Sequence, residues 1–520
     1  MPKALLIVLA VAAAAVALGV GIDAVGDSSA KDAGAARQGR PNVVVLMTDD
    51  QTVEDMDVLP RTRELLGAEG VTFAHNYVSY PVCCPSRATF FSGQYAHNHG
   101  VMGLYPPTGG YVRFDRWNSL PVWLQRAGYA TAHIGKYMNG YGTQVKADVP
   151  PGWTEWHGAI DGSTYRMWGY TLDENGHRHT YGKPFVRDPR LYQTDVYRRK
   201  AVDFIKRRAP STQPFFLSVA FLAPHHESAS IRAVTGKLVR PAPRDAAALP
   251  NRSIATTRAF DEGNVSDKPA FLRHAPLGLR AMDRIGEHYL QRQRSLLAVD
   301  DAVNAIVAAL RDQGELDNTY IVFTSDNGYM QGEHDVPSGK MLPYDPSTQV
   351  PLLVRGPGIP HGLVSRELVG NIDLAPTILQ VAHARAGLTE DGRSLLPFAR
   401  HPDRRTRRAF LHETGGLRYI PVRDQDQDGA LAVRRILSYR AVRTNRWLYV
   451  EYRSGARELY DLSRDPSELH SHYPDPRYRP LRRTLHRLLR RLEHCRGAPC
   501  RQPAPPAAEA GPRPALKRLA

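Results

Sequence analysis

Residues 40–405 combine two patterns of apolar and polar positions. Short β-branched runs at 41–50 (PNVVVLMTDD), 214–226 (PFFLSVAFLAPHH) and 319–328 (TYIVFTSDNG) are largely apolar until their last residues and predict strands buried on both faces. Amphipathic stretches lie between such runs, and the longest, at 290–314, has helical periodicity and ends at a glycine. Because strands alternate with helices, we expect an α/β domain built on a large, mainly parallel, doubly wound sheet.

The pattern changes after residue 405. Residues 434–462 alternate apolar and polar positions with turn residues between them, which predicts antiparallel strands. The stretch 479–495 (RPLRRTLHRLLRRLEHC) places five leucines at helical spacing opposite a basic face. We therefore expect a smaller α+β domain at 406–495, followed at 496–520 by a disordered tail rich in Pro, Ala and Arg.

Residues 1–30 have the composition of a secretory signal. Lys3 precedes an uncharged run at 4–20, and small residues follow it. An uncleaved membrane anchor is the alternative interpretation, because the run is close to the length of one membrane span; no stable membrane partner is expected if the signal is cleaved. Both interpretations predict a secreted or extracytoplasmic protein, in a compartment where disulfides persist. Cys495 and Cys500 are expected to pair, with free thiols as the alternative.

Positive charge is concentrated towards the C-terminus. The net charge is +16, and residues 401–520 contain 26 Lys and Arg against 13 Asp and Glu. The basic face of the helix predicted at 479–495 is either solvated surface or a binding face for a polyanion. Nucleic acid is not the expected partner, because the basic segment lacks interleaved aromatic residues and the chain carries an export signal.

Acidic and amide side chains terminate two of the apolar runs. Asp49 and Asp50 end the first run, and Asp326 and Asn327 lie near the end of the run at 319–328. In a doubly wound sheet, ligands bind at the carboxyl ends of the strands, so these four side chains are expected to converge. An all-oxygen set suits a hard cation, and we predict one Ca²⁺ per chain, with Mg²⁺ as the alternative ion. Helix capping by the acidic pairs is the competing interpretation.

The segment 83–93 (CCPSRATFFSG) has the features of a helix start. Pro85 fits the first turn, so Cys83 is expected just before the helix N-terminus, where backbone N–H groups favour an anion and lower the pKa of a thiol. Arg87 adds a permanent positive charge one turn later. A cation, an arginine and a helix N-terminus around one nucleophile describe a site for a tetrahedral oxyanion. Two buried structural cysteines are the alternative.

This segment resembles the signature of the sulfatase family, Cys-x-Pro-Ser-Arg followed by Thr or Ser and Gly, whose first cysteine is oxidised to Cα-formylglycine. The spacing to Pro-Ser-Arg makes that residue Cys83 rather than Cys84. Other segments are similar to family motifs, in the same order, between about residues 42 and 462; among them are MTDDQ at 47–51 and TSDNGYMQGEH at 324–334. The resemblance implies an alkaline-phosphatase-like fold with a divalent metal beside the modified cysteine.

The resemblance also implies roles for individual residues. The metal ligands are Asp49, Asp50, Asp326, Asn327 and the modified Cys83, and the catalytic side chains are Cys83, Arg87, Lys136, His225 and Lys340. His334 is a candidate substrate contact, with a histidine on a surface loop as the alternative. One position departs from the pattern: many sulfatases have a catalytic histidine two residues after the lysine of Gly-Lys, and Met138 stands there.

The implied reaction is hydrolysis of a sulfate ester by the metal-bound gem-diol of formylglycine. One hydroxyl attacks sulfur, His225 with Lys340 nearby protonates the leaving oxygen, and loss of the second hydroxyl proton expels sulfate and restores the aldehyde. Segments such as VPLLVRGPG at 350–358 are most similar to the N-acetylglucosamine-6-sulfatase branch, so the expected substrate is a sulfated carbohydrate of glycosaminoglycan type or an aryl sulfate. A formylglycine-generating enzyme is the implied partner in maturation.

Two other functions are compatible with these residues. A phosphomonoester or phosphonate-ester hydrolase on the same fold can share the formylglycine signature. A non-catalytic binder of sulfated polysaccharide would use the basic C-terminal helix instead of the metal centre. The intact set of cysteine and acidic residues favours an enzyme over such a binder.

Overall fold

The computed structural model describes residues 39–143, 148–254, 256–273, 275–415, 438–509 and 511. The signal predicted at 1–30 lies outside these ranges. From Arg40 onward the chain forms one compact unit. Within the described ranges, none of the helices is both long enough and apolar enough to cross a membrane.

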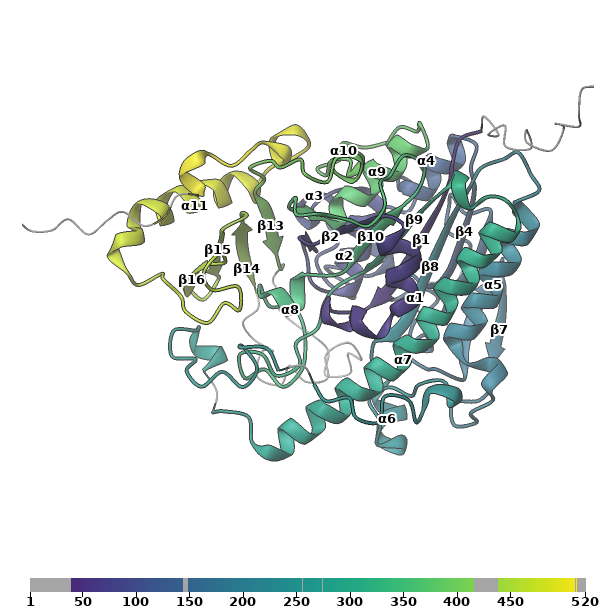
Figure 1. Cartoon of the computed structure of the whole chain (residues 1–520), viewed down its shortest axis with the longest axis horizontal. Coiled ribbons are helices and arrows are strands. Elements are labelled where there is room, and N and C mark those ends of the chain that lie inside the picture. The colour runs from purple at the N-terminus through teal and green to yellow at the C-terminus, as the bar shows by residue number, and fades with distance from the viewer. Residues whose placement is uncertain are drawn as a thin grey trace, which may run out of the picture. The chain divides into compact units, whose positions relative to one another are not determined.

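Ten strands form one large sheet (Figure 1). In spatial order they are β11 (Leu363–Ser365), β2 (Val71–Phe73), β10 (Leu352–Arg355), β9 (Thr319–Ser325), β1 (Asn42–Asp49), β8 (Phe215–Pro224), β4 (Ala130–Lys136), β5 (Glu155–Ala159), β6 (Tyr170–Glu174) and β7 (His177–Tyr181). The five neighbours from β9 to β5 run parallel. The predicted α/β class with a mainly parallel sheet is confirmed.

Some outer strands reverse direction. β10 is antiparallel to β9, and β6 and β7 add an antiparallel pair beyond β5. The chain leaving β9 makes no crossover helix, since residues 326–351 form loops and the short helix α8 (Asp345–Thr348). A parallel return needs a crossover of about a dozen residues or more that carries the chain back to the opposite edge of the sheet. β10 therefore starts at the edge where β9 ends and runs antiparallel to it.

Helices cover both faces of this sheet. Alternate residues of β1 point to opposite faces: Val45 packs with one group of helices and Leu46 with the other, so the whole strand is buried. On the Val45 side lie α2 (Cys83–Ser92), α4 (Leu120–Arg126) and α9 (Leu374–Val381), and on the Leu46 side lie α5 (Gln193–Arg208) and α7 (Leu279–Asp312). The helix predicted at 290–314 corresponds to the last two-thirds of α7, which ends at Asp312.

The register of the central strands brings their carboxyl ends level. Thr48 pairs with Ser325 across β1 and β9, and Asp49 pairs with Pro224 across β1 and β8. The residues that follow these three strand ends therefore leave the sheet at one place, which is where ligands bind in this type of fold.

Short elements connect these layers. They are η1 (Glu54–Val58), α1 (Pro60–Thr62), the π-helical η2 (Arg63–Ala68), β3 (Asn76–Tyr77), α3 (Ala96–His99), η3 (Tyr111–Arg113), η4 (Pro189–Leu191), α6 (Ala229–Thr235), η5 (Pro243–Asp245), η6 (Ala270–Leu272), η7 (Leu316–Asn318), β12 (Val369–Gly370), η8 (Asn371–Asp373), α10 (Leu396–Arg400) and η10 (Pro476–Tyr478).

A second sheet of four antiparallel strands follows the large one. It contains β13 (Phe410–Glu413), β14 (Tyr439–Arg443), β15 (Trp447–Tyr452) and β16 (Arg457–Asp461). α11 (Arg479–Leu492) packs against this sheet and, as predicted, buries five leucines: Leu481, Leu485, Leu488, Leu489 and Leu492. Arg443 of β14 forms an ion pair with Asp345 (Nη2–Oδ2, 3.0 Å), which joins the second sheet to α8.

The segment at 496–509 packs beside α11. The sequence assigns it to a disordered tail, but it forms η11 (Ala498–Arg501) and η12 (Pro506–Ala508). Ala504 and Ala508 are buried in the same cluster as the α11 leucines, because small side chains let the backbone approach closely. The predicted disulfide between Cys495 and Cys500 is present at the start of this segment.

Replacing Leu485 by Ala tests the packing of α11. Leu485 is fully buried, so the variant leaves a cavity and is expected to lower the free energy of unfolding by about 2–5 kcal/mol. Arg483→Ala is the matched control on the exposed side of the same helix, and should change stability by less than about 0.5 kcal/mol. Guanidinium denaturation followed by tryptophan fluorescence measures both. Equal effects of the two variants would contradict the packing described.

Candidate active site

Four oxygen-bearing side chains converge at the carboxyl ends of β1 and β9. Asp49 ends β1, Asp50 follows it with a left-handed backbone (φ 64°), and Asp326 and Asn327 follow β9; all four are buried. Asp50 N donates to Asp326 Oδ1 at 3.3 Å, and Asn327 Nδ2 donates to Asp50 Oδ1 at 2.5 Å. The structure thus brings together the residues that the sequence assigns to the metal.

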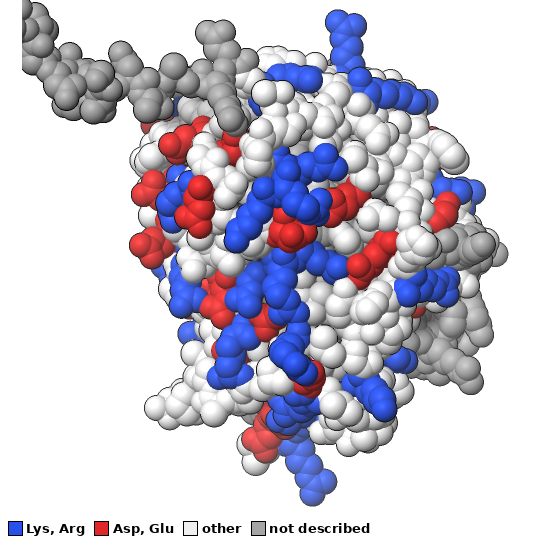
Figure 2. All heavy atoms as spheres, turned by 90° about the vertical axis from the view of Figure 1, so that its right-hand side faces the viewer, with Lys and Arg blue, Asp and Glu red and all other residues white. Residues whose placement is uncertain are grey.

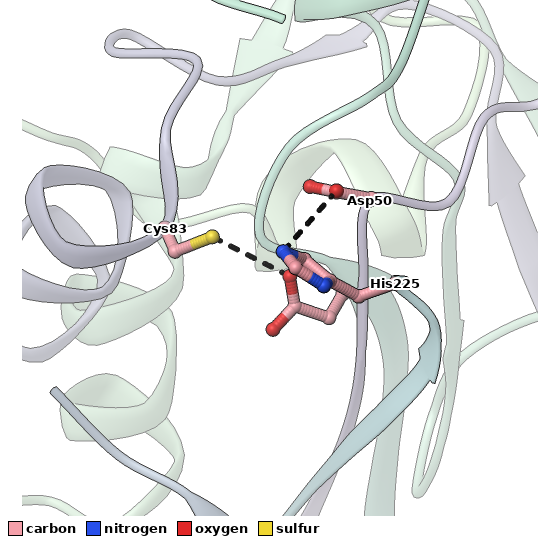
Figure 3. Close-up of side chains that lie close together, drawn as sticks. Asp50, Cys83 and His225 are labelled. Carbon is pink, nitrogen blue, oxygen red and sulfur yellow. Dashed lines mark hydrogen bonds and ion pairs between the residues drawn. The ribbon is translucent and has the colours of Figure 1, made fainter. Parts of the chain in front are cut away.

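Cys83 is the first residue of α2, after the extended residue Val82. Its Sγ lies 3.4 Å from Asp49 Oδ1 and accepts a hydrogen bond from Lys340 Nζ at 3.0 Å. Figure 3 shows the sulfur directed from the helix towards side chains that follow the ends of β1 and β8. The whole of α2 is buried, so the helix N-terminus holds this thiol at a fixed place beside the carboxylates.

Arg87, one turn after Cys83, joins the two acidic strand ends. Its Nε donates to Asp326 Oδ2 at 2.8 Å and its Nη2 donates to Asp49 Oδ2 at 3.0 Å. Its Nη1 donates to the carbonyl of Lys136 at 2.8 Å. All three hydrogen bonds are buried, and each fixes the position of α2 relative to one strand of the sheet.

Two lysines complete the cationic part of the site. Lys136, the last residue of β4, places Nζ 2.6 Å from Asp49 Oδ2 and 4.6 Å from the centre of the Tyr165 ring. The preceding Gly135 is required there, because a Cβ would lie 2.1 Å from the carbonyl oxygen of Ala220. Lys340 donates to Asp50 Oδ1 at 2.6 Å.

Charges balance within this buried cluster. Asp49, Asp50 and Asp326 supply three carboxylates, and Arg87, Lys136 and Lys340 supply three cations. Burial by itself would raise the pKa of Asp49, but Lys136, His225, Arg87 and Lys340 outweigh it and hold that pKa well below its usual range.

His225 follows β8 and faces Asp50. Its Nε2 lies 3.6 Å from Asp50 Oδ2, and its Nδ1 is 2.7 Å from the carbonyl oxygen of His226 (Figure 3). One ligand atom from each of Asp49, Asp50, Cys83 and His225 lies within 4.8 Å of the others. The sequence assigns His225 to catalysis alone; the structure adds it to the group that surrounds the candidate metal position.

The donor set fits a hard divalent cation. Among the described residues, Asp50 Oδ2 and Asn327 Oδ1 are buried oxygens that accept no hydrogen bond. Carboxylate and amide oxygens are the ligands that Ca²⁺ and Mg²⁺ prefer. Asp49, Asp50, Asp326 and Asn327 could therefore hold such an ion, with the side chain at position 83 beside it.

Sequence reasoning missed Arg292 of α7. This fully buried arginine donates from Nη2 to the carbonyl of Asp50 at 2.6 Å and from Nη1 to the carbonyl of Pro224 at 3.2 Å, and so joins the ends of β1 and β8. Arg292 precedes Leu296 by four residues and so lies on the apolar face of the helix. An arginine on such a face needs buried partners, and this position could have identified it from the sequence.

His334 is not one of the four residues that surround the candidate metal position, and it does not lie on the surface. It is fully buried, its Nδ1 is 2.6 Å from Glu262 Oε2, and its ring is 4.3 Å from that of Tyr344. Burial lowers the pKa of His334 by more than the neighbouring Glu262 carboxylate raises it, so the neutral form of the ring is favoured. His334 also lines a cavity of ≈ 140 Å³ together with Glu54 and Glu468.

Cys84, the residue after Cys83, packs against Met138. Cys84 Sγ is 3.8 Å from Met138 Sδ, and both residues are buried. Burial raises the pKa of Cys84 to about 12, so its thiol is neutral at ordinary pH. The position at which many sulfatases carry a histidine is thus an apolar contact to the second cysteine.

Comparison with known families identifies the class of the chain. The sulfatase family model matches residues 41–384, and a model described as N-sulphoglucosamine sulphohydrolase, C-terminal, matches residues 332–495. The chain belongs to the sulfatase family.

Curated relatives include sulfatases from animals and algae. Human N-acetylglucosamine-6-sulfatase is 36% identical over 379 residues, which cover 70% of this chain and 65% of that protein. An arylsulfatase of Volvox carteri is 33% identical over 525 residues, which cover 91% of this chain and 78% of that protein. The chain spans only 48% and 34% of the length of the extracellular sulfatase Sulf-1 homologs of Caenorhabditis elegans and Drosophila melanogaster.

Solved structures share the fold at low identity. The protein BT4656, solved with its substrate D-glucosamine-2-N,6-O-disulfate, has a TM-score of 0.70 at 22% identity over 87% of this chain and 97% of its own. The phosphonate monoester hydrolase of Agrobacterium radiobacter has a TM-score of 0.61 at 21% identity over 88% and 96%. Both likenesses establish the fold and not the substrate.

Metal binding is expected to stabilise the folded chain. Ca²⁺ added to chelator-treated protein should raise the thermal midpoint, since a ligand at 100 times its Kd stabilises the folded state by about 2.7 kcal/mol. Asp326→Asn removes one carboxylate and should abolish most of the shift, whereas Asp317→Asn, at a fully exposed site, should retain it. Differential scanning calorimetry with Ca²⁺ and Mg²⁺ measures the shift. An undiminished shift in Asp326→Asn would contradict the assigned ligands.

Proposed function

We propose that the protein is a secreted sulfuric ester hydrolase that uses a formylglycine made from Cys83 and one divalent cation, Ca²⁺ or Mg²⁺. The observation that carries this proposal is the position of Cys83 in a chain of the sulfatase family. Its sulfur sits in the first turn of α2, 3.4 Å from Asp49 and 3.0 Å from Lys340. A cysteine with a purely structural role does not need carboxylates and a lysine around its sulfur, as Cys83 has. Cys84, whose sulfur makes an apolar contact, fits a structural role instead.

The buried charges suit a sulfate ester. Three carboxylates and three cationic side chains cancel, so a bound divalent cation leaves the site with a net positive charge that favours an anionic ester. The cation would withdraw charge from the sulfate oxygens, and the hydrated aldehyde at position 83 would supply the attacking hydroxyl. Arg87, Lys136 and Lys340 hold their positive charges around that position without reorganisation, because each already has fixed carboxylate partners.

His225 and Lys340 are the proposed proton donors to the leaving oxygen. His225 Nδ1 lies against the carbonyl of His226, and its Nε2 faces Asp50, so Nε2 is the atom directed into the site. Lys340 contacts both Asp50 and Cys83, which places its ammonium between the metal ligands and the nucleophile. General acid catalysis by such a group contributes about 10²–10⁴-fold in rate. Met138 supplies no base, so a group other than the usual histidine must accept the proton when sulfate is released.

The proposed substrate is a sulfated sugar of the N-acetylglucosamine-6-sulfate type or an aryl sulfate. Its support is the similarity to proteins named N-acetylglucosamine-6-sulfatase and arylsulfatase. The buried His334 beside the cavity of ≈ 140 Å³ is the proposed substrate contact. Secretion and a formylglycine-generating partner follow from the predicted signal and from the cysteine signature.

A phosphomonoester or phosphonate-ester hydrolase is the second candidate. The specific observation in its favour is the shared fold with a phosphonate monoester hydrolase. The net positive charge of the metal-loaded site suits phosphate as well as sulfate esters, so electrostatics alone does not separate the two.

Conversion of Cys83 is testable by mass. Formylglycine replaces CH₂SH by CHO, so a peptide covering 80–93 from active enzyme should be about 18 Da lighter than its unmodified form, with the loss at Cys83. Cys83→Ala should abolish hydrolysis of an aryl sulfate, while the matched variant Cys84→Ala should retain measurable activity. Tandem mass spectrometry locates the change. Full activity in Cys83→Ala would overturn the enzyme proposal and favour a non-catalytic binder.

The ester preference separates the two candidate hydrolases. We expect kcat/KM for 4-nitrophenyl sulfate to exceed the values for 4-nitrophenyl phosphate and 4-nitrophenyl phenylphosphonate by at least about tenfold. A tenfold ratio corresponds to a difference of about 1.4 kcal/mol in transition-state binding. All three esters release the same kind of chromophore, so one spectrophotometric assay serves. Preference for the phosphorus esters would assign the protein to the second candidate. Glucosamine-6-sulfate and N-acetylglucosamine-6-sulfate, assayed by sulfate release, then test the sugar class.

A further inference from the structure

Helix α11 carries a row of arginines that the chemistry of the metal centre does not use. The helix contains six arginines and no acidic residue. Arg479, Arg483 and Arg487 are exposed and lie four residues apart, so they follow one line along the helix at intervals of about 6 Å. We call these three residues the arginine row.

The arginine row directs its charge into solvent. Across the described ranges, its guanidinium groups take part in no ion pair or hydrogen bond, unlike other arginines of the same helix. Arg490 pairs with Glu493 at 2.6 Å, and Arg482 lies 4.7 Å from the centre of the Tyr473 ring. The exposed line of the helix is thus the part whose positive charge is uncompensated.

Helix stability does not account for this arrangement. Like charges four residues apart destabilise a helix by about 0.2–0.5 kcal/mol per pair. The row also begins in the first turn, where the helix dipole favours acidic residues and α11 has none. The buried leucines on the opposite side hold the helix in spite of these charges, and the dipole adds to the positive potential of Arg479.

A comparably basic helix, α5, shows the contrasting arrangement. Its Lys200 pairs with Glu174 at 2.9 Å and its Arg207 pairs with Glu155 at 2.7 Å. Figure 2 looks onto the side of the molecule where Figure 1 places α5, and basic and acidic side chains lie next to one another over that face. A helix rich in basic residues can thus have its charge neutralised by nearby acidic side chains, as in α5. The arginine row of α11 has no such acidic partners among the described residues.

We propose that the arginine row is a binding site for a sulfated polysaccharide, separate from the metal centre. The planar guanidinium fork pairs with the oxygens of tetrahedral anions in two hydrogen bonds, and arginine is the residue best suited to this contact. A linear polymer with repeated sulfates meets successive arginines of a straight row, whereas a single sulfated sugar meets one. The choice of sulfated polysaccharide over other polyanions rests on the proposed function.

Immobilised heparin is the probe, and the Cys83→Ala protein is the background, so that binding is measured without turnover. The test variant replaces Arg479, Arg483 and Arg487 by Gln. The matched control removes the same charge from exposed residues elsewhere: Lys183, Arg199 and Lys206, each to Gln. We expect the test variant to lose about tenfold or more in heparin affinity at 150 mM salt. We also expect its slope of log K against log salt to fall by about two to three, by analogy with counterion release from nucleic acids, with little change in the control.

Equal affinities of the two triple variants would overturn the proposal, because net charge alone would then govern heparin binding. A loss of binding to vesicles of anionic phospholipid, with heparin binding unchanged, would assign the row to a membrane surface and overturn it as well. Since the readout needs no catalysis, a negative result in the ester assays leaves this test unaffected, and a negative result here leaves the hydrolase proposal unaffected.

Discussion

The arrangement of the site depends on the hydrogen bonds that the guanidinium of Arg87 donates to two carboxylates. The guanidinium bridges Asp49 at the end of β1 and Asp326 after β9, and all three groups are buried. Carboxylates so close together in a buried place repel one another, and removing one partner of a buried pair costs about 3–5 kcal/mol. Arg87 belongs to the helix that begins with Cys83, so the interaction that neutralises the acids also sets the distance between Cys83 and the two acidic strand ends.

The fold supplies this contact through its strand ends. β1 lies between β8 and β9, and parallel pairing brings the carboxyl ends of all three to one edge. Residues 326–351 remain beyond β9 without a crossover helix and carry both Asn327 and Lys340. Because no crossover helix carries the chain back to the opposite edge of the sheet, Lys340 stays at the edge where β9 ends. β10 starts at that same edge and runs antiparallel to β9.

Sequence reasoning was strongest where local pattern decides the structure. The apolar runs ending in Asp49 and Asp326 identified two strand ends, and the leucine spacing identified the buried side of α11. It failed where a contact joins distant segments. Arg292 donates to carbonyls of Asp50 and Pro224 that lie 242 and 68 residues away in the chain, and backbone carbonyls leave no mark in a sequence. The packing of residues 496–509 was missed for a related reason, because alanine and proline give little signal when their burial comes from a neighbouring helix.

The second sheet contributes to the surroundings of the site as well as to stability. Glu458 of β16 is buried and accepts hydrogen bonds from three tyrosines: Tyr344 at 2.8 Å, Tyr452 at 2.6 Å and Tyr460 at 2.5 Å. Tyr344 belongs to the loop after β9, and its ring packs against His334. The C-terminal family model begins at residue 332, inside that same loop. Asp49 and Asp326 are thus held near Cys83 by strand ends of the first sheet, whereas Lys340 and His334 belong to the loop after β9, which the second sheet contacts through Tyr344. We therefore expect a change in the second sheet to alter the surroundings of His334 more than the Arg87 bridge between Asp49 and Asp326.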